Sequence, residues 1–403
     1  MITINSFLHR EEFSDIIRRW MYDEARPSDA DLITRLVHFN HVYVSRYLDL
    51  FSRLVFGELH HHEFSACPIR VKGELKDALV KTPAYRNERI DELIRDYRQN
   101  PGRFYRETPF HGTLYFSNRS CGRVEYIGAS RIKRSRRLAE KSARRIIDRL
   151  FDKIKQHADK LADDRAQLLG IPRECLLTAP EGMVEEFLEA ENRLLQQFRD
   201  KSSTEAGTKG ELAINDVAGM KVILEEGKRG ELTALLDRLP DCEILEEEDH
   251  SGRYNATNLT VRFRPPRDEI VARPLGQGLI DAMGERGYSS DEANRAFVGF
   301  VRSGEEDVLL EIILSTYQEL LESEIGRSIH EDRIIEQRLC QQYRGPLAVN
   351  IQSLLEYLFI FPASRQRELG ELPIKLWNRY LPDTLDEILR QLFRIPSDNV
   401  ADP

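Results

Sequence analysis

The stretch that decides the fold runs from residue 124 to residue 149 and reads VEYIGASRIKRSRRLAEKSARRIIDR. Its first part alternates apolar and polar residues as a strand does, and its last part has the period of a helix. Between them stands a cluster of cations, which could hold phosphate oxygens or could be a solvated basic helix face. Its members are Arg131, Lys133 and Lys141, surrounded by Arg134, Arg136, Arg137, Arg144, Arg145 and Arg149.

The length and composition are typical of a soluble, globular protein of roughly two or three domains. Of its 403 residues, 41% are hydrophobic and 32% are charged, and the net charge of -9 argues against wholesale non-specific nucleic-acid binding. The five cysteines are scattered without a C-x-x-C pair, as expected in a reducing compartment. The N-terminus lacks the apolar run of a signal peptide, and the longest apolar stretch, Leu354 to Phe361, is too short to span a bilayer. We therefore predict a cytoplasmic protein without membrane contact.

Three regions are predicted along the chain. Residues 1–110 have a helical pattern, in which Ser28-x-x-Asp31 resembles a capping box. Residues 111–340 mix strands and helices and carry a helical insertion at about 142–205, and residues 341–403 are again helical. The predicted fold class is α/β of the α+β kind, with a small mixed sheet and large helical additions. The expected strands are Thr113–Ser117, Arg123–Ala129, Met220–Leu224, Asn258–Arg264, Ala296–Val301 and Val308–Leu314.

Two acids stand at positions that favour a nucleotide site at one edge of such a sheet. Asp216 precedes the strand that begins near Met220, and Glu311 lies inside the apolar strand Val308–Leu314. An unpaired buried carboxylate is costly, so Glu311 should face solvent, a cation or a metal. From the residues alone, an exposed strand position and a functional acid are both open for Glu311.

Four segments, taken in order, resemble the synthetase domain of RelA/SpoT-type alarmone synthetases. They read SRIKRSRRLAEK (130–141), NDVAGMKVIL (215–224), SGRYNATNLTV (251–261) and LLEIILST (309–316). That family has a nucleotidyltransferase-like fold and moves pyrophosphate from ATP to the 3'-hydroxyl of a guanine nucleotide with the help of Mg²⁺. The resemblance spans roughly residues 123–330, and the order of the segments is more specific than any one of them.

The resemblance implies a role for each matching residue. Asp216 would bind Mg²⁺, and Glu311 would bind the metal or take the proton of the attacking hydroxyl. Tyr254 matches the tyrosine on which the acceptor base stacks, and Asn258 takes the place of a family histidine beside the acceptor. The ATP phosphates would be held by Arg131, Lys133, Lys141 and Lys221.

Departures from the family pattern fall mainly on the acceptor side. Lys221 replaces an arginine and loses its bidentate fork, Asn258 replaces the histidine, and Ile313 and Ser315 replace a glutamine and an arginine. The acceptor is therefore open between GDP or GTP and, as in toxin-like relatives, the 3' end of tRNA. His330-Glu331-Asp332 is not the His-Asp pair of the family's hydrolase domain, so alarmone degradation is not expected.

Two other hypotheses stand beside the enzyme. The domain could be catalytically degenerate and bind a nucleotide or a partner without turnover, or the motif matches could be chance within a helical scaffold. A structure without a mixed sheet bringing Asp216 and Glu311 together would favour the scaffold. The aromatic stripes near residues 32–56 and 354–361 could form a homo-oligomer interface or a helical core.

Overall fold

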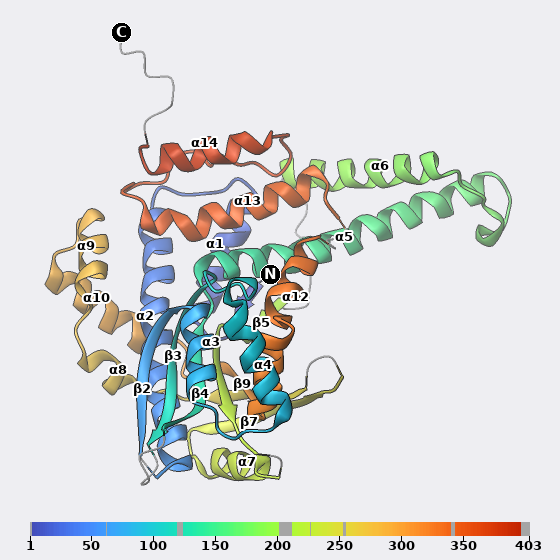
Figure 1. Cartoon of the computed structure of the whole chain (residues 1–403). Coiled ribbons are helices and arrows are strands. Elements are labelled where there is room, and N and C mark those ends of the chain that lie inside the picture. Colours follow the sequence, from blue (N-terminus) through green and yellow to red (C-terminus); the bar gives the residue numbers. More distant parts are fainter. Residues whose placement is uncertain are drawn as a thin grey trace.

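The computed structural model describes residues 2–61, 63–118, 124–200, 212–225, 227–252, 255–339 and 343–395. Its centre is a seven-stranded sheet, and a helical arm projects from the body (Figure 1). The strand order is β2-β3-β4-β6-β9-β8-β7. The strands are β2 (Phe64–Val71), β3 (Pro109–Asn118), β4 (Val124–Ile132), β6 (Ala218–Ile223), β7 (Cys242–His250), β8 (Ala256–Phe263) and β9 (Val308–Ser315).

The sheet is mixed, which confirms the predicted α+β class. Neighbouring strands are antiparallel except β6 and β9, which run parallel in the middle of the sheet. A separate two-stranded parallel ladder joins β1 (Ile2–Ile4) to β5 (Leu212–Ile214). The sheet is larger than expected, because β2 and β7 each add an edge strand that the sequence pattern did not indicate.

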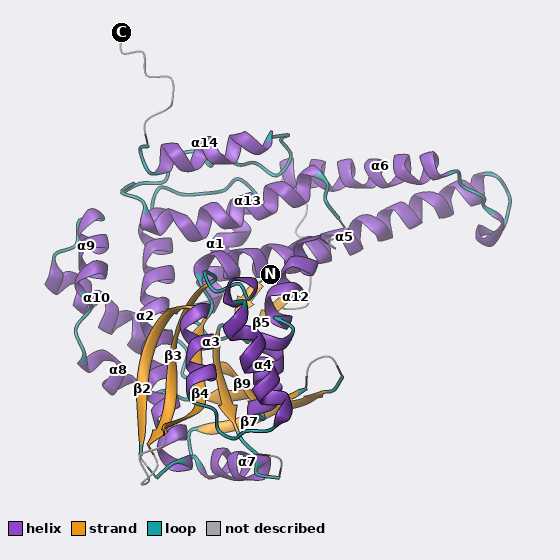
Figure 2. Cartoon of the chain, viewed as in Figure 1, coloured by secondary structure: helices purple, strands orange, loops and turns teal. Residues whose placement is uncertain are grey.

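The two faces of the sheet are covered by different helices (Figure 2). Alternate residues of β9, such as Leu310 and Ile312, are buried in the larger core, which is built around α2 (Asp29–Leu59). Glu311 lies between them and points to the opposite face, because successive side chains of a strand alternate. On that face α3 (Lys72–Lys81), α4 (Glu88–Gln99) and α11 (Tyr317–Leu321) form a smaller core and leave part of the sheet to the site described below.

The N-terminal region is less purely helical than predicted. β2 lies within residues 1–110 and pairs with β3, so the sheet begins well before residue 111. Ser28 makes no side-chain cap, so the predicted capping box is wrong. The start of α2 is held instead by the buried carboxylate of Asp29, which accepts from Arg19 Nη1 at 2.7 Å and from Trp20 Nε1 at 3.0 Å.

The predicted strand Ala296–Val301 is wrong, because these residues belong to α10 (Ser290–Ser303). Ser289 caps this helix and Glu292 completes a capping box. Its buried residues recur at helical spacing, and an apolar run this short does not distinguish strand from helix by itself. The segment that follows it therefore joins a helix to β9 and does not join two strands.

The helical insertion is confirmed as an arm made of α5 (Ser135–Leu168) and α6 (Pro180–Arg199), which pack side by side (Figure 1). The base of α5 packs against α13 (Pro346–Ile360). Within the described residues, one stretch is long and apolar enough for a membrane span, Pro346–Ala363, but 72% of it is buried inside the fold. The remaining helices are α1 (Arg10–Met21), α7 (Arg229–Arg238), α8 (Arg267–Ala272), α9 (Gln277–Glu285), α12 (Ile329–Leu339) and α14 (Pro382–Leu392).

Candidate functional site

A cavity of about 1420 Å³ lies where β4 ends, β6 begins and α5 starts. The register explains why these segments meet. β4 and β6 are antiparallel, with Arg131 opposite Gly219, so the end of one strand adjoins the beginning of the other. Gly219 is in turn opposite Glu311 in the parallel pair of β6 and β9. The two predicted acids, Asp216 and Glu311, therefore line one cavity, as the enzyme hypothesis requires and the scaffold hypothesis does not.

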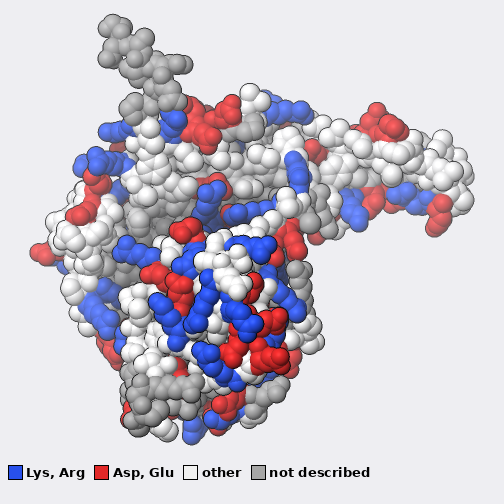
Figure 3. All heavy atoms as spheres, viewed as in Figure 1, with Lys and Arg blue, Asp and Glu red and all other residues white. Residues whose placement is uncertain are grey.

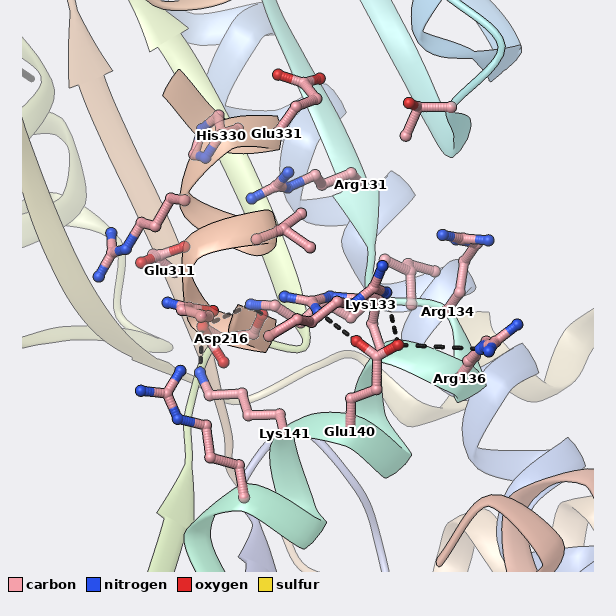
Figure 4. Close-up of a pocket in the computed structure, with 18 of the residues that line it drawn as sticks. Arg131, Lys133, Arg134, Arg136, Glu140, Lys141, Asp216, Glu311, His330 and Glu331 are labelled. Atoms are coloured by element: carbon pink, nitrogen blue, oxygen red, sulfur yellow. Dashed lines mark hydrogen bonds and ion pairs between the residues drawn. The ribbon is translucent and has the colours of Figure 1, made fainter. Parts of the chain in front are cut away.

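Asp216 is the centre of the site (Figure 4). Its Oδ2 atom lies 2.5 Å from Lys133 Nζ and 2.6 Å from Lys141 Nζ. Lys133 Nζ also donates to the main-chain oxygen of Asp216 at 2.6 Å. The other carboxylate atom, Oδ1, is buried and has no hydrogen-bond partner among the described residues. Two of the predicted phosphate-binding lysines thus converge on the predicted metal ligand and leave one of its oxygens available.

The charges of this group shift one another's pKa values. Burial alone would raise the pKa of Asp216, but the two ammonium groups hold it well below its usual range, so Asp216 is ionised at neutral pH. Burial lowers the pKa of Lys133 to about 8; Asp216 opposes this shift, whereas Arg131 and Lys141 add to it. Lys133 therefore loses its proton close to physiological pH, which an exposed lysine does not do.

Glu311 and Asn258 face the cavity from neighbouring strands. Asn258 Nδ2 lies 3.3 Å from Glu311 Oε1, and Asn258 Oδ1 is buried without a hydrogen-bond partner in the described part of the chain. The structure therefore places Asn258 beside the predicted catalytic acid. Tyr254, the other predicted acceptor residue, lies outside the described residues.

Lys221 lies in β6 and is not among the residues that line the cavity, whose described members include Lys133 and Lys141. It pairs with Ala129 across β4 and β6, and the charges of Arg131 and Glu311 act on its pKa. Its predicted role at the ATP phosphates stays a prediction. Burial lowers the pKa of Lys221 to about 8, while the nearby carboxylate of Glu324 opposes this effect and Lys72 adds to it.

Much of the basic helix face lines the cavity. Arg134, Arg136 and Arg137 line it together with Arg144 and Arg145. In total, eleven lysines and arginines and seven aspartates and glutamates form its walls, within a chain of net charge -9. Figure 3 shows basic and acidic side chains interspersed over the body beneath the arm. The positive excess in the cavity favours an anionic ligand.

One acidic residue, Glu140, pairs with several of the arginines that line the cavity. Glu140 on α5 pairs with Arg137 on the same helix and accepts from Arg338 Nη2 of α12 at 2.7 Å. Arg136 lies 3.9 Å from the same carboxylate (Figure 4). Glu140 therefore joins two helices that wall the cavity and holds their guanidinium groups toward one another.

Several cavity residues carried no sequence signal. Lys72 comes from the start of α3, and His330 and Glu331 come from the first turn of α12. Burial, together with the charges of Lys221 and Arg131, lowers the pKa of His330 well below its usual value, so its ring is neutral at pH 7. These residues are remote in sequence from the motifs, so no local pattern could assign them to the site.

The donor set fits Mg²⁺ better than a metal that requires a complete cage of protein ligands. No group of three or more histidine, cysteine or acidic side chains suited to a metal occurs within the described ranges. Mg²⁺ keeps several waters and is commonly bound by one or two carboxylates together with substrate phosphates. Asp216, with its unpartnered buried oxygen, and Glu311 supply those carboxylates.

No protein-family model and no curated protein matches this chain. Among solved structures, the small alarmone synthetase 1 from Bacillus subtilis is similar over 54% of this chain and 92% of that chain, with 12% identity and a TM-score of 0.18. A TM-score this low does not establish a shared fold. The function is therefore inferred from the residues of the site and the motifs of the sequence.

Proposed function

We propose that the protein is a pyrophosphotransferase that moves pyrophosphate from ATP to the 3'-hydroxyl of a nucleotide, with GDP or GTP as the favoured acceptor. The observation that carries this proposal is the geometry of Asp216. Its carboxylate is held by Lys133 and Lys141 in a basic cavity, and one of its oxygens has no hydrogen-bond partner among the described residues. This is an arrangement for a metal–triphosphate complex, and the four motifs in family order support the same chemistry.

The size and charge of the cavity support two nucleotide substrates. A pocket for one drug-sized ligand is about 300–1,000 Å³, and this cavity is about 1420 Å³. Lys133, Lys141 and Arg131 lie where they can contact the phosphates of ATP. Cations that are fixed before the reaction stabilise charge on the transferring phosphoryl oxygens without reorganising, and that is the main means of catalysis in phosphoryl transfer.

Asp216 and Glu311 would hold the magnesium ion, which when bound neutralises charge on the phosphates and polarises the phosphorus under attack. Lys133 and Lys141, which pair with Asp216 in this structure, would give up part of their contact with its carboxylate and bind phosphate oxygens instead. In the reaction, a bond forms between the acceptor 3'-oxygen and the β-phosphorus, and the bond from that phosphorus to the α,β-bridging oxygen breaks. AMP leaves, and the proton of the hydroxyl passes to Glu311.

The test is an acceptor assay with the full chain. Protein, Mg²⁺ and γ-labelled ATP are incubated in four separate reactions. The acceptor is GDP, GTP or tRNA in three of them, and the fourth contains no acceptor other than ATP itself. We expect label in the guanine nucleotide and release of one AMP for each transfer. Asp216→Ala should abolish transfer, whereas Asp152→Ala, at an exposed position of α5 outside the cavity, should not.

A non-catalytic nucleotide-binding protein is the second candidate, and one observation favours it. Asp216 already has two lysines on one oxygen, so its own charge is balanced without a metal. Binding of ATP without transfer to any acceptor would support this candidate and refute the enzyme. Label on tRNA alone would instead assign the acceptor to an RNA 3' end.

A further inference from the structure

Some of the residues that line the cavity lie around Lys72, which is close to Glu331, Thr108 and Phe110. They come from the start of α3, from β3 and the residue before it, and from the first turn of α12, and we call this end of the cavity the second lobe. Figure 4 shows Glu331 at the end of the cavity opposite Lys141, with its carboxylate directed away from Asp216. The residues that line this lobe are Lys72, Thr108, Phe110, His111 and Glu331. None of them has a role in the transfer of pyrophosphate proposed above.

Glu331 is the unusual residue of this lobe. Its side chain is 6% exposed, and both carboxylate oxygens are buried without a hydrogen-bond partner in the part of the chain that the structure describes. A buried carboxylate that accepts no hydrogen bond is costly, because the hydrogen bonds that it made to water are not replaced. Such a group at a cavity wall is suited to a ligand that brings its own donors.

The nearby lysines balance the charge of Glu331 but do not satisfy its oxygens. Lys72 Nζ and Lys76 Nζ lie 3.6 and 3.8 Å from Glu331 Oε1, beyond hydrogen-bond distance. Each lysine is engaged elsewhere: Lys72 donates to Glu324 at 2.5 Å, and Lys76 donates to the main-chain oxygen of Phe104 at 2.6 Å. Their positive charges therefore lie beside Glu331 without supplying a hydrogen bond to either of its oxygens.

A carboxylate whose two oxygens have no partner among the described residues matches a planar edge that carries two adjacent N–H donors, as in bidentate pairing with a guanidinium group. Among the standard nucleobases, guanine alone has two adjacent donors on its Watson–Crick edge, N1–H and the 2-amino group. Adenine and cytosine place an acceptor beside their donor, and uracil flanks its donor with acceptors.

We infer that Glu331 is the residue that selects guanine in the acceptor, by accepting hydrogen bonds from N1–H and the 2-amino group. This inference rests on the proposed function for the presence of an acceptor nucleotide in the second lobe. Asp216, Lys133 and Lys141 then act on the ATP side, and Glu331 determines the base of the other substrate. The 3'-hydroxyl of that substrate would lie between the two lobes.

The test measures binding rather than turnover, so that it does not depend on catalysis. The full chain is saturated with Mg²⁺ and α,β-methylene-ATP, and GDP, IDP and ADP are then titrated by calorimetry. IDP lacks only the 2-amino group of GDP. Because a hydrogen bond to a charged group contributes about 1.5–3 kcal/mol, GDP should bind about 10- to 100-fold more tightly than IDP.

The variants separate base selection from charge balance. Glu331→Gln offers one hydrogen-bond acceptor and one donor in place of two acceptors, so the ratio of GDP to IDP affinity should fall close to one. Glu331→Asp keeps a carboxylate beside the two lysines, but its shorter side chain moves the oxygens away from the base. The melting temperature should therefore be kept while the ratio of GDP to IDP affinity falls. Asp332→Asn, a change to the neighbouring carboxyl that does not line the cavity, should leave the ratio unchanged.

A structural role predicts the opposite pattern. If Glu331 serves only as a counter-ion, Glu331→Gln lowers the melting temperature and leaves the ratio of GDP to IDP affinity at its wild-type value, which overturns the inference. Equal binding of GDP, IDP and ADP to the wild type also overturns it. Tight, Glu331-dependent binding of GDP without transfer of label would keep this inference and refute the proposed activity, so the two failures are distinguishable.

Discussion

Lys133 should make ATP binding depend on pH in a range where ordinary lysines do not titrate. Burial lowers its pKa to about 8, and its ammonium group is held in the cavity by Asp216. The protonated form is the one that attracts phosphate. Raising the pH through 8 should therefore weaken binding, because the free protein must then take up a proton when the nucleotide binds.

The magnitude follows from the protonated fraction of Lys133. At pH 7 about nine tenths of a group with a pKa of about 8 is protonated, and at pH 9 about one tenth is. The affinity for Mg²⁺ and α,β-methylene-ATP should thus fall roughly tenfold between pH 7 and pH 9, with most of the loss above pH 8. Calorimetric titrations at half-unit steps of pH measure it, and repeating them in buffers of different ionisation enthalpy reports the proton uptake.

Two matched variants identify the titrating group. Lys133→Arg keeps a positive charge throughout this range, because arginine does not deprotonate in proteins, so its affinity should be flat to pH 9. Lys221 also has a pKa lowered to about 8 but does not line the cavity, so Lys221→Arg should retain the wild-type fall. An affinity that is flat in the wild type, or a fall that persists in Lys133→Arg and vanishes in Lys221→Arg, would refute the assignment.

Three further predictions concern single residues. Asp216→Asn keeps the shape of the side chain but removes the charge, so transfer should drop at least about 100-fold; activity within threefold of wild type in the acceptor assay would contradict its role. Asp29→Ala removes the carboxylate that pairs with the buried Arg19 and leaves an empty space beside it. The free energy of unfolding, measured in urea, should fall by about 3–5 kcal/mol, whereas a loss below about 1 kcal/mol would show that the pair is dispensable. Gly128→Ala places its Cβ 2.2 Å from a backbone carbonyl and should cost about 1–3 kcal/mol, with Gly230→Ala, which meets nothing within 4 Å, as the control that should not.

Much of the fold could be predicted because its signals are local. The alternation of β4, the helical period of α5 and the caps and breaks around the arm all act between residues a few positions apart. The failures were local ambiguities of the same kind. The short apolar run Ala296–Val301 has no decisive period, and β7 is an edge strand rich in acids, whose exposed side chains carry no pattern of burial.

The candidate site could be predicted in part, because its chemistry lies at strand ends that the sequence marks. Asp216, Glu311, Lys133 and Lys141 were all expected, and the structure places them around one cavity. Lys221 does not line this cavity, and a motif does not tell which residues of a strand reach the edge of a site. That depends on register, which is set by partners across the sheet.

By itself, the sequence determined that a strand would end in a cluster of cations and open into a long basic helix, and that two acids would stand at other strands. Only the tertiary structure decided what these groups meet. Lys133 reaches Asp216 across 83 residues of chain, past the whole helical arm. Glu331, from a helix with no recognisable motif, is buried at the wall of the same cavity, and its oxygens have no hydrogen-bond partner among the residues that the structure describes. Periodicity is a property of neighbours in the chain, whereas hydrogen-bond partners and pKa values are properties of neighbours in space, and the folded sheet alone brings those together.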